Sequence, residues 1–96
     1  MIREHAILPV RPGREDDFLV AFATARPFIE SMPGLRGLSL SRSVEVPSQF
    51  LLLVEWGRLE DHTEGFRLSP EYSEWKAMLH SFYHPFPDVQ HFVDVA

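Results

Sequence analysis

The residues best suited to chemistry gather in one stretch, from His62 to Pro87. It holds three of the five histidines, one of the two tryptophans and both tyrosines of the chain. Imidazoles exchange protons near neutral pH, and aromatic rings stack on flat ligands. We therefore interpret the stretch either as the wall of a pocket or as a heavily packed structural lid.

His62 is the candidate catalytic base. It lies four residues before Phe66, so the two side chains share one face if this segment is helical. An imidazole with the ordinary pKa of about 6.5 can take the proton from a bound phenol and leave an electron-rich anion that reacts with O₂. The alternative is a histidine that only caps or packs a short helix.

Aromatic side chains form a second candidate, a wall that binds substrate. Tyr72, Trp75, Leu79 and Phe82 recur at spacings of three, four and three, which is typical of one helix face. Together with Phe66, the three aromatic members of this stripe could stack on a planar aromatic ligand. The alternative is a plain hydrophobic core.

Two polar residues on predicted strands complete the candidate binding site. His5 could donate a hydrogen bond to a ligand oxygen, and it faces either the helices or a partner subunit. The alternative is a half-buried histidine that a neighbouring backbone group or glutamate satisfies. Arg42 shares the parity of Leu38 and Leu40, so it could hold an oxyanion or pair with Glu55 across an interface. A salt bridge at the rim is the simpler interpretation.

The remaining histidines do not indicate a metal site. His80 and His84 are four residues apart, but Pro85 follows at once and no carboxylate partner is evident. A structural or catalytic metal needs three or more ligands in a fixed geometry. The chain also has no Gly-rich phosphate loop and no dinucleotide fingerprint, so we expect neither a metal nor a cofactor.

Composition bounds the remaining function classes. Ninety-six residues are expected to form a single domain, residues 1–96, with 45% apolar and 24% charged residues. Nine basic against fourteen acidic residues give a net charge of −5, and no basic run occurs. Nucleic acid and anionic membranes are therefore poor partners. Cysteine is absent, and no apolar run approaches the length of a membrane span, so we expect a cytoplasmic protein.

The elements that must position these residues follow from periodicity and turn signals. Strands are predicted over Ile2–Val10, Leu35–Ser43, Phe50–Trp56 and Val89–Val95. Helices are predicted over Arg14–Met32, over Leu59–Phe66 (interrupted at Gly65), and from a start at Ser69-Pro70 to a stop at His84-Pro85. Pro27 is expected to kink or break the first helix near Thr24–Arg26. The order βαββαβ predicts an α+β, ferredoxin-like fold with a four-stranded antiparallel sheet whose first and third strands are central.

The sheet also predicts a partner. Two helices can cover only one face of a four-stranded sheet. The first and third predicted strands are nevertheless apolar on both parities, as in Ile2–Val10 and Phe50–Trp56. The simplest cover for the second face is another copy of the chain, which would make a symmetric homodimer.

The whole pattern resembles the antibiotic biosynthesis monooxygenase family. The pieces that carry the resemblance are R-P-G at 11–13, M-P-G at 32–34, L-V-E-W at 53–56, L-E-D-H at 59–62 and F-R-L-S-P-E-Y at 66–72. The resemblance implies a dimeric α/β barrel, with a pocket between helices and sheet that first-strand and second-helix residues line. It also implies oxidation of polycyclic phenols or quinols by O₂ without metal or flavin.

The resemblance includes a branch that binds and degrades haem, with an Asn on the first strand, a His on the second long helix and a Trp before it. Here the first strand has no Asn, Lys76 stands at the His position and Phe66 at the Trp position, while His80 lies one turn further on. We therefore favour a cofactor-independent monooxygenase for a small aromatic or quinol substrate. The alternatives are a non-catalytic dimeric protein that binds a small apolar molecule and, third, a haem-degrading enzyme.

Overall fold

The computed structural model describes all residues, 1–96, and has the predicted ferredoxin-like element order. Its elements are β1 (Ile2–Pro9), α1 (Glu15–Glu30), β2 (Leu35–Arg42), β3 (Gln49–Trp56), η1 (Asp61–Phe66), α2 (Pro70–Leu79), η2 (His80–Phe82) and β4 (Val89–Phe92). The sheet has the order β2-β3-β1-β4 and every neighbouring pair is antiparallel. The prediction of a four-stranded antiparallel sheet with β1 and β3 in the centre is confirmed.

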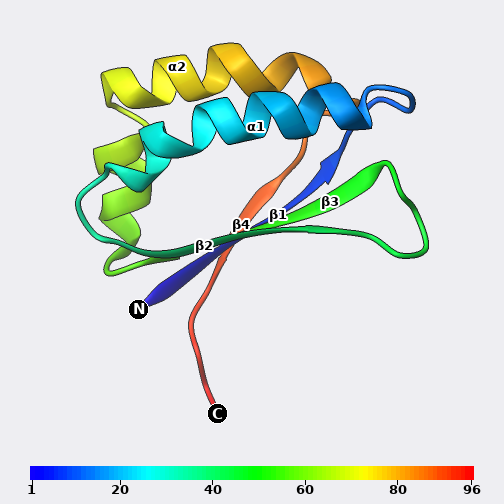
Figure 1. Cartoon of the computed structure of the whole chain (residues 1–96). Helices are drawn as coiled ribbons and strands as arrows, with labels where there is room; N and C mark the ends of the chain where they lie inside the picture. The colour runs from blue at the N-terminus through cyan, green and yellow to red at the C-terminus, as the bar shows by residue number, and fades with distance from the viewer.

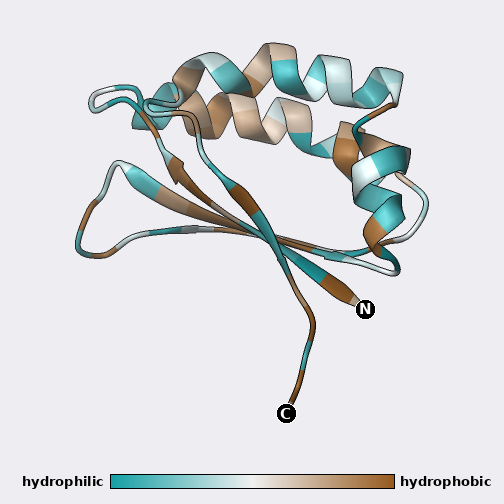
Figure 2. Cartoon of the chain, turned by 180° about the vertical axis from the view of Figure 1, so that it is seen from behind, coloured by the Kyte–Doolittle hydropathy of each residue, from teal (hydrophilic) through white to brown (hydrophobic).

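The molecule has two layers. Both long helices, α1 and α2, lie side by side over one face of the sheet, and no helix covers the other face (Figure 1). Seen from behind, the helices again lie on one side of the sheet only, and the strands carry both apolar and polar residues (Figure 2). Alternate residues of the central strands point into the helix layer and are buried there: Ala6, Leu8, Phe50, Leu52, Val54 and Trp56. The core therefore lies between the helices and one face of the sheet.

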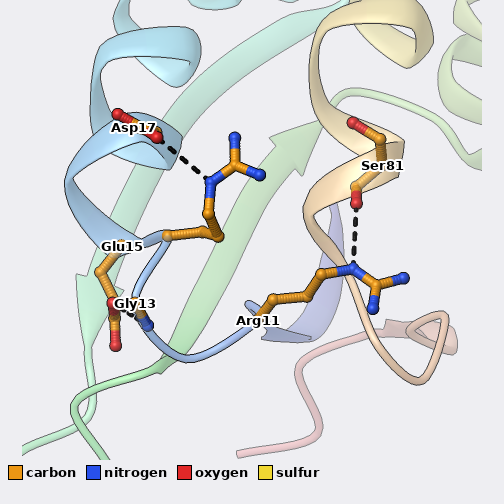
Figure 3. Close-up of polar contacts among 6 residues, drawn as sticks. Arg11, Gly13, Glu15, Asp17 and Ser81 are labelled. Carbon is orange, nitrogen blue, oxygen red and sulfur yellow. Dashed lines mark hydrogen bonds and ion pairs between the residues drawn. The ribbon is translucent and has the colours of Figure 1, made fainter.

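The turn before α1 is tied to the end of the other helical segment. Gly13 adopts a φ of +91°, a left-handed conformation that favours glycine, and its N–H donates to the Glu15 carboxylate at 2.8 Å. The Arg11 Nε donates to the main-chain oxygen of Ser81 at 3.3 Å (Figure 3). These contacts fix where α1 begins relative to η2, at the opposite end of the layer from η1.

Of the kink or break predicted at Pro27, the break is wrong. The helix α1 runs without interruption from Glu15 to Glu30, and the N–H of Ser31 donates to the Pro27 oxygen at 3.1 Å. Proline removes one helical hydrogen bond, here the one to the carbonyl of Ala23. Ala23 and Pro27 both lie on the exposed side of α1, so water can satisfy that carbonyl.

The segment that carries His62 is a π-helix rather than an interrupted α-helix. It continues through Gly65, contrary to the predicted interruption, and the Arg67 N–H donates to the His62 oxygen at 3.1 Å. The restart at Ser69 is confirmed: its Oγ accepts a hydrogen bond from the Tyr72 N–H at 3.1 Å. The wide turn of a π-helix is often found at functional sites.

The last strand is shorter than predicted. It ends at Phe92, so Val93 and Val95 lie outside the sheet, and the terminus leaves the body of the molecule (Figure 1). Both valines are exposed, which removes the packing that would extend the strand. Within the whole chain, no helix has the length and apolar character needed to cross a membrane.

Candidate functional site

A cavity of about 500 Å³ lies between the helix layer and the sheet. Its apolar walls come from the helix-facing side chains of β1 and β3, among them Ala6, Leu8 and Leu52. Its polar wall contains Glu4 and His62. A cavity of this size, mostly apolar with a few polar groups, is typical of small-molecule sites.

Four of the predicted site residues line this cavity: His62, Phe66, Tyr72 and Trp75. The rings of Tyr72 and Trp75 meet the Phe66 ring edge-on, with centroids 5.2 and 5.9 Å away. The wall is therefore an interlocked set of rings that can hold a flat ligand on its exposed faces.

His5 lies on the other side of the sheet. Successive residues of a strand point to opposite faces, and the helix face of β1 is taken by Glu4, Ala6 and Leu8. The His5 ring instead meets the edge of Phe92, with centroids 5.5 Å apart. The option of a pocket-facing His5 is therefore wrong for this chain, and His5 belongs to the uncovered face.

Arg42 also lies outside the cavity. It ends β2, where its Nε donates to the Pro47 oxygen at 2.6 Å and its guanidinium lies 5.4 Å from the Phe50 ring centroid. The expected partner, Glu55, contacts Arg3 instead, with nitrogen and oxygen 3.6 Å apart. Arg42 is exposed, binds the β2–β3 connection and does not line the cavity, so a ligand bound there would not contact it.

Phe82 is buried, but in the core rather than at the cavity. Its ring packs against Phe18 with centroids 5.7 Å apart, and the Arg14 guanidinium lies 5.1 Å from it. The cause is a change of helical pitch, since α2 ends at Leu79 and a tighter 3₁₀ turn follows. This turn rotates the apolar stripe, so the next residue, Tyr83, lines the cavity.

Glu4 is the residue that sequence reasoning missed. It is only 5% exposed, and its Oε1 accepts a hydrogen bond from the Trp56 Nε1–H at 2.9 Å. The same oxygen lies 3.3 Å from the His62 Nε2. The sequence did contain a sign of this role. Glu4 alternates with Ala6 and Leu8 on one side of the strand, and a carboxylate among apolar residues that face the core indicates a buried polar site.

His62 is held on three sides. Its ring stacks on the Trp56 indole with centroids 5.5 Å apart and planes inclined by 14°. Its Nδ1 lies 2.7 Å from the Nε2 of His91. His91 is a second residue of the site that the sequence analysis did not identify. Glu4 and His91 are opposite each other in the β1–β4 ladder, so their side chains leave the same face of the sheet toward His62.

Burial controls the charge of this group. Burial, the positive charge of Arg67 and the neighbouring His91 together lower the pKa of His62 to about 3, and burial has the largest effect. Burial likewise raises the pKa of the Glu4 carboxyl, although the hydrogen bond from Trp56 opposes the change. His62 is therefore neutral near pH 7, and its contact with Glu4 is not a salt bridge between two full charges.

His80, which was not among the predicted site residues, also lines the cavity. Its ring lies edge-on to Phe86 with centroids 4.9 Å apart, and burial and the charge of Lys76 lower its pKa. His80 lines the cavity, whereas His84 is exposed. The chain contains no group of three or more His, Cys, Asp or Glu that could hold a metal ion.

Acidification should destabilise the protein through His62. In the unfolded chain its imidazole binds a proton below pH 6.5, but in the folded protein only near pH 3. The unfolded state therefore binds more protons, and the His62 contribution to the free energy of unfolding should fall by about 2 kcal/mol from pH 7 to pH 5. Urea unfolding followed by circular dichroism at both pH values measures it.

The control must remove Glu4, because its raised pKa has the opposite effect and favours the folded state as the carboxyl becomes protonated. The comparison is therefore Glu4→Gln against the double variant Glu4→Gln/His62→Gln. The first should lose stability more steeply on acidification than the second. Identical pH dependence in the two proteins would contradict the assignment of His62 as a buried neutral imidazole.

Comparison with known proteins shows to which family the chain belongs. Residues 1–78 match the model of the family described as "Antibiotic biosynthesis monooxygenase". The chain is 56% identical over 95 residues to the uncharacterized protein YczJ of Bacillus subtilis (strain 168), and the match covers 99% of this chain and 100% of YczJ.

Solved structures give the same result. A Bordetella bronchiseptica protein assigned to the same family superposes with a TM-score of 0.92 at 36% identity, covering 99% of this chain and 97% of that one. SnoaB, a cofactor-independent oxygenase from Streptomyces nogalater, superposes with a TM-score of 0.86 at 15% identity, covering 99% and 93%. The second likeness is one of fold.

Proposed function

Because the chain belongs to the antibiotic biosynthesis monooxygenase family, we propose that it is a cofactor-independent monooxygenase that oxidises a small aromatic or quinol substrate with O₂. One observation carries the proposal: a buried carboxylate–imidazole pair, Glu4 and His62, stands on the wall of an otherwise apolar cavity. SnoaB, which shares the fold, is a cofactor-independent oxygenase.

The pair supplies the proton acceptor that such a reaction needs. The phenol passes its proton to the pair rather than to His62 alone, because burial disfavours a full imidazolium at His62. The electron-rich phenolate that remains transfers electrons to O₂ and forms a carbon–oxygen bond. The resulting peroxide anion is then protonated to a hydroperoxide. The hydroperoxide loses water, which takes the outer oxygen atom and the hydrogen of the attacked carbon, and a quinone is left. One oxygen atom enters the product and the other leaves as water, so atoms and electrons balance.

The walls provide what the anion chemistry requires. Phe66, Tyr72 and Trp75 can stack on the rings of a flat substrate and hold it beside His62. Apolar side chains of β1 and β3 on the opposite side exclude water, which strengthens the electrostatic effect of each polar group in the cavity. Arg67 lines the same cavity and brings a positive charge near the developing anion.

The test is O₂ uptake with a panel of naphthols and quinols, with the autoxidation of each compound subtracted. We expect His62→Ala to lower kcat by about 10²–10⁴-fold, the range for loss of a general base. His84→Ala is the matched control, since His84 is exposed and does not line the cavity. Labelled ¹⁸O₂ should place one atom in the quinone.

Other outcomes separate the competing functions. Equal rates for wild type and His62→Ala would remove His62 from the mechanism. Tight binding of these compounds without any O₂ uptake would instead indicate a non-catalytic binding protein. A Soret shift on addition of haemin would indicate the haem-degrading alternative.

We also propose that a second copy of the chain covers the bare face of the sheet. That face presents apolar side chains from the two central strands, including Ile7, Leu51 and Leu53, and no helix of the chain covers it. His5 lies on the same face, so in the proposed dimer it would face the partner subunit. The dimer leaves the cavity on the helix side complete within each copy.

A further inference from the structure

Glu4, His62 and His91 form one continuous polar chain through the apolar core, and each comes from a different element. The Glu4 Oε1 lies 3.3 Å from the His62 Nε2, and the His62 Nδ1 lies 2.7 Å from the His91 Nε2. Glu4 and His62 line the cavity, whereas His91 does not. The His91 side chain is half-buried on β4, at the edge of the sheet, so the chain connects the cavity with the surface.

We propose that His91 is the outlet and return point for the proton that Glu4 and His62 take from the substrate. The inference rests on the proposed function for its substrate class, a phenol or quinol. His91 acts only through His62, and we therefore regard it as a positioning residue that completes a proton path.

Two proton arrangements satisfy both contacts of His62. In the first, a protonated Glu4 donates to the His62 Nε2, and the His62 Nδ1–H donates to the His91 Nε2. In the second, the Nε2–H of His62 donates to a Glu4 carboxylate, and His91 donates to the His62 Nδ1. Passing from the first to the second moves one proton from Glu4 to His91.

His62 need not become a cation while the proton passes. Its pKa is lowered to about 3 by burial, so a full imidazolium is unfavourable at this position. An imidazole that gains a proton at Nε2 while it gives up the proton at Nδ1 stays close to neutral throughout. The 3.3 Å contact with Glu4 is slightly long for transfer, and such contacts commonly shorten when substrate binds.

The path fits the balance of the reaction. One proton travels out to His91 as the phenolate forms, and one returns as the peroxide anion is protonated. No net proton leaves in a complete turnover, because both hydrogens lost by the phenol end in the water molecule.

The first test needs no substrate. In ¹⁵N-labelled protein, an N–H···N hydrogen bond between His62 and His91 should give a low-field proton and a scalar coupling between the two ring nitrogens. The coupling should vanish in His91→Ala and persist in His84→Ala, whose side chain is exposed. A wild-type protein without this coupling overturns the proposal, whatever the protein catalyses.

The second test separates the proton path from oxygenation. Without O₂, 1-naphthol is mixed with the protein and formation of bound naphtholate is followed by absorbance. We expect His91→Ala to slow this step on the order of tenfold to a hundredfold with unchanged naphthol affinity, since His91 does not line the cavity. Added imidazole should restore the rate, and pyrazole, a ring of the same size but a far weaker base, should not.

Each result decides one proposal. Naphtholate formation without later O₂ uptake would refute the monooxygenase and leave the proton path standing. Failure of the wild type to deprotonate naphthol, or a His91→Ala rate that equals wild type or ignores imidazole, would overturn the path. Loss of naphthol affinity in His91→Ala, without rescue, would show that His91 is merely structural.

Discussion

Replacing Trp56 with alanine should lower the free energy of unfolding by about 4–6 kcal/mol, close to the whole stability of a domain of this size. Trp56 is fully buried, stacks on His62 and donates its indole N–H to Glu4. Alanine would leave a cavity under the π-helix and would also leave the buried carboxyl without this donor. Urea unfolding followed by circular dichroism measures the loss.

Trp56→Phe separates the two contributions. Phenylalanine keeps most of the packing and the ring surface against His62, but it cannot donate to Glu4, so we expect a loss of about 1–3 kcal/mol. The hydrogen bond from Trp56 lowers the pKa of Glu4, so its removal should raise that pKa further. A Trp56→Phe protein as unstable as Trp56→Ala would place the whole effect in the hydrogen bond and contradict the packing argument.

The sequence was informative where one local segment determined the outcome. Ser69 and Pro70 mark a helix start by their own chemistry, and Tyr72 and Trp75 share a face through helical spacing alone. His62 and Phe66 were placed together for the same reason, and both line the cavity. These predictions needed only the period of a helix and the preferences of its first turn.

The missing part of the site depends on contacts between distant strands. Glu4 and His91 are opposite each other because β1 pairs with β4 in one particular register, which no local pattern reveals. Their meeting point is His62, which lies on a third element. Phe82 was expected at the cavity for a different reason. The prediction extended the α-helical spacing through Phe82, but a 3₁₀ turn with fewer residues per turn follows Leu79.

Replacing Leu53 with aspartate should convert the proposed dimer to monomers. Leu53 is half-buried on β3 and faces away from the helices, beside Leu51 and across from Ser39 of β2. Each dimer would have to bury two new carboxylates without a partner, at a cost of several kcal/mol per charge. We therefore expect the dissociation constant to rise by two orders of magnitude or more, measured by analytical ultracentrifugation.

Leu19→Asp is the matched control, because it introduces the same charge on the exposed side of α1, where Leu19 is 39% exposed. It should leave the association state unchanged. If wild type is monomeric at micromolar concentration, or if both variants remain dimeric, the bare face of the sheet is not the interface. A monomeric Leu53→Asp protein that still deprotonates naphthol would show that the cavity with Glu4 and His62 works within a single copy, as its position between helices and sheet requires.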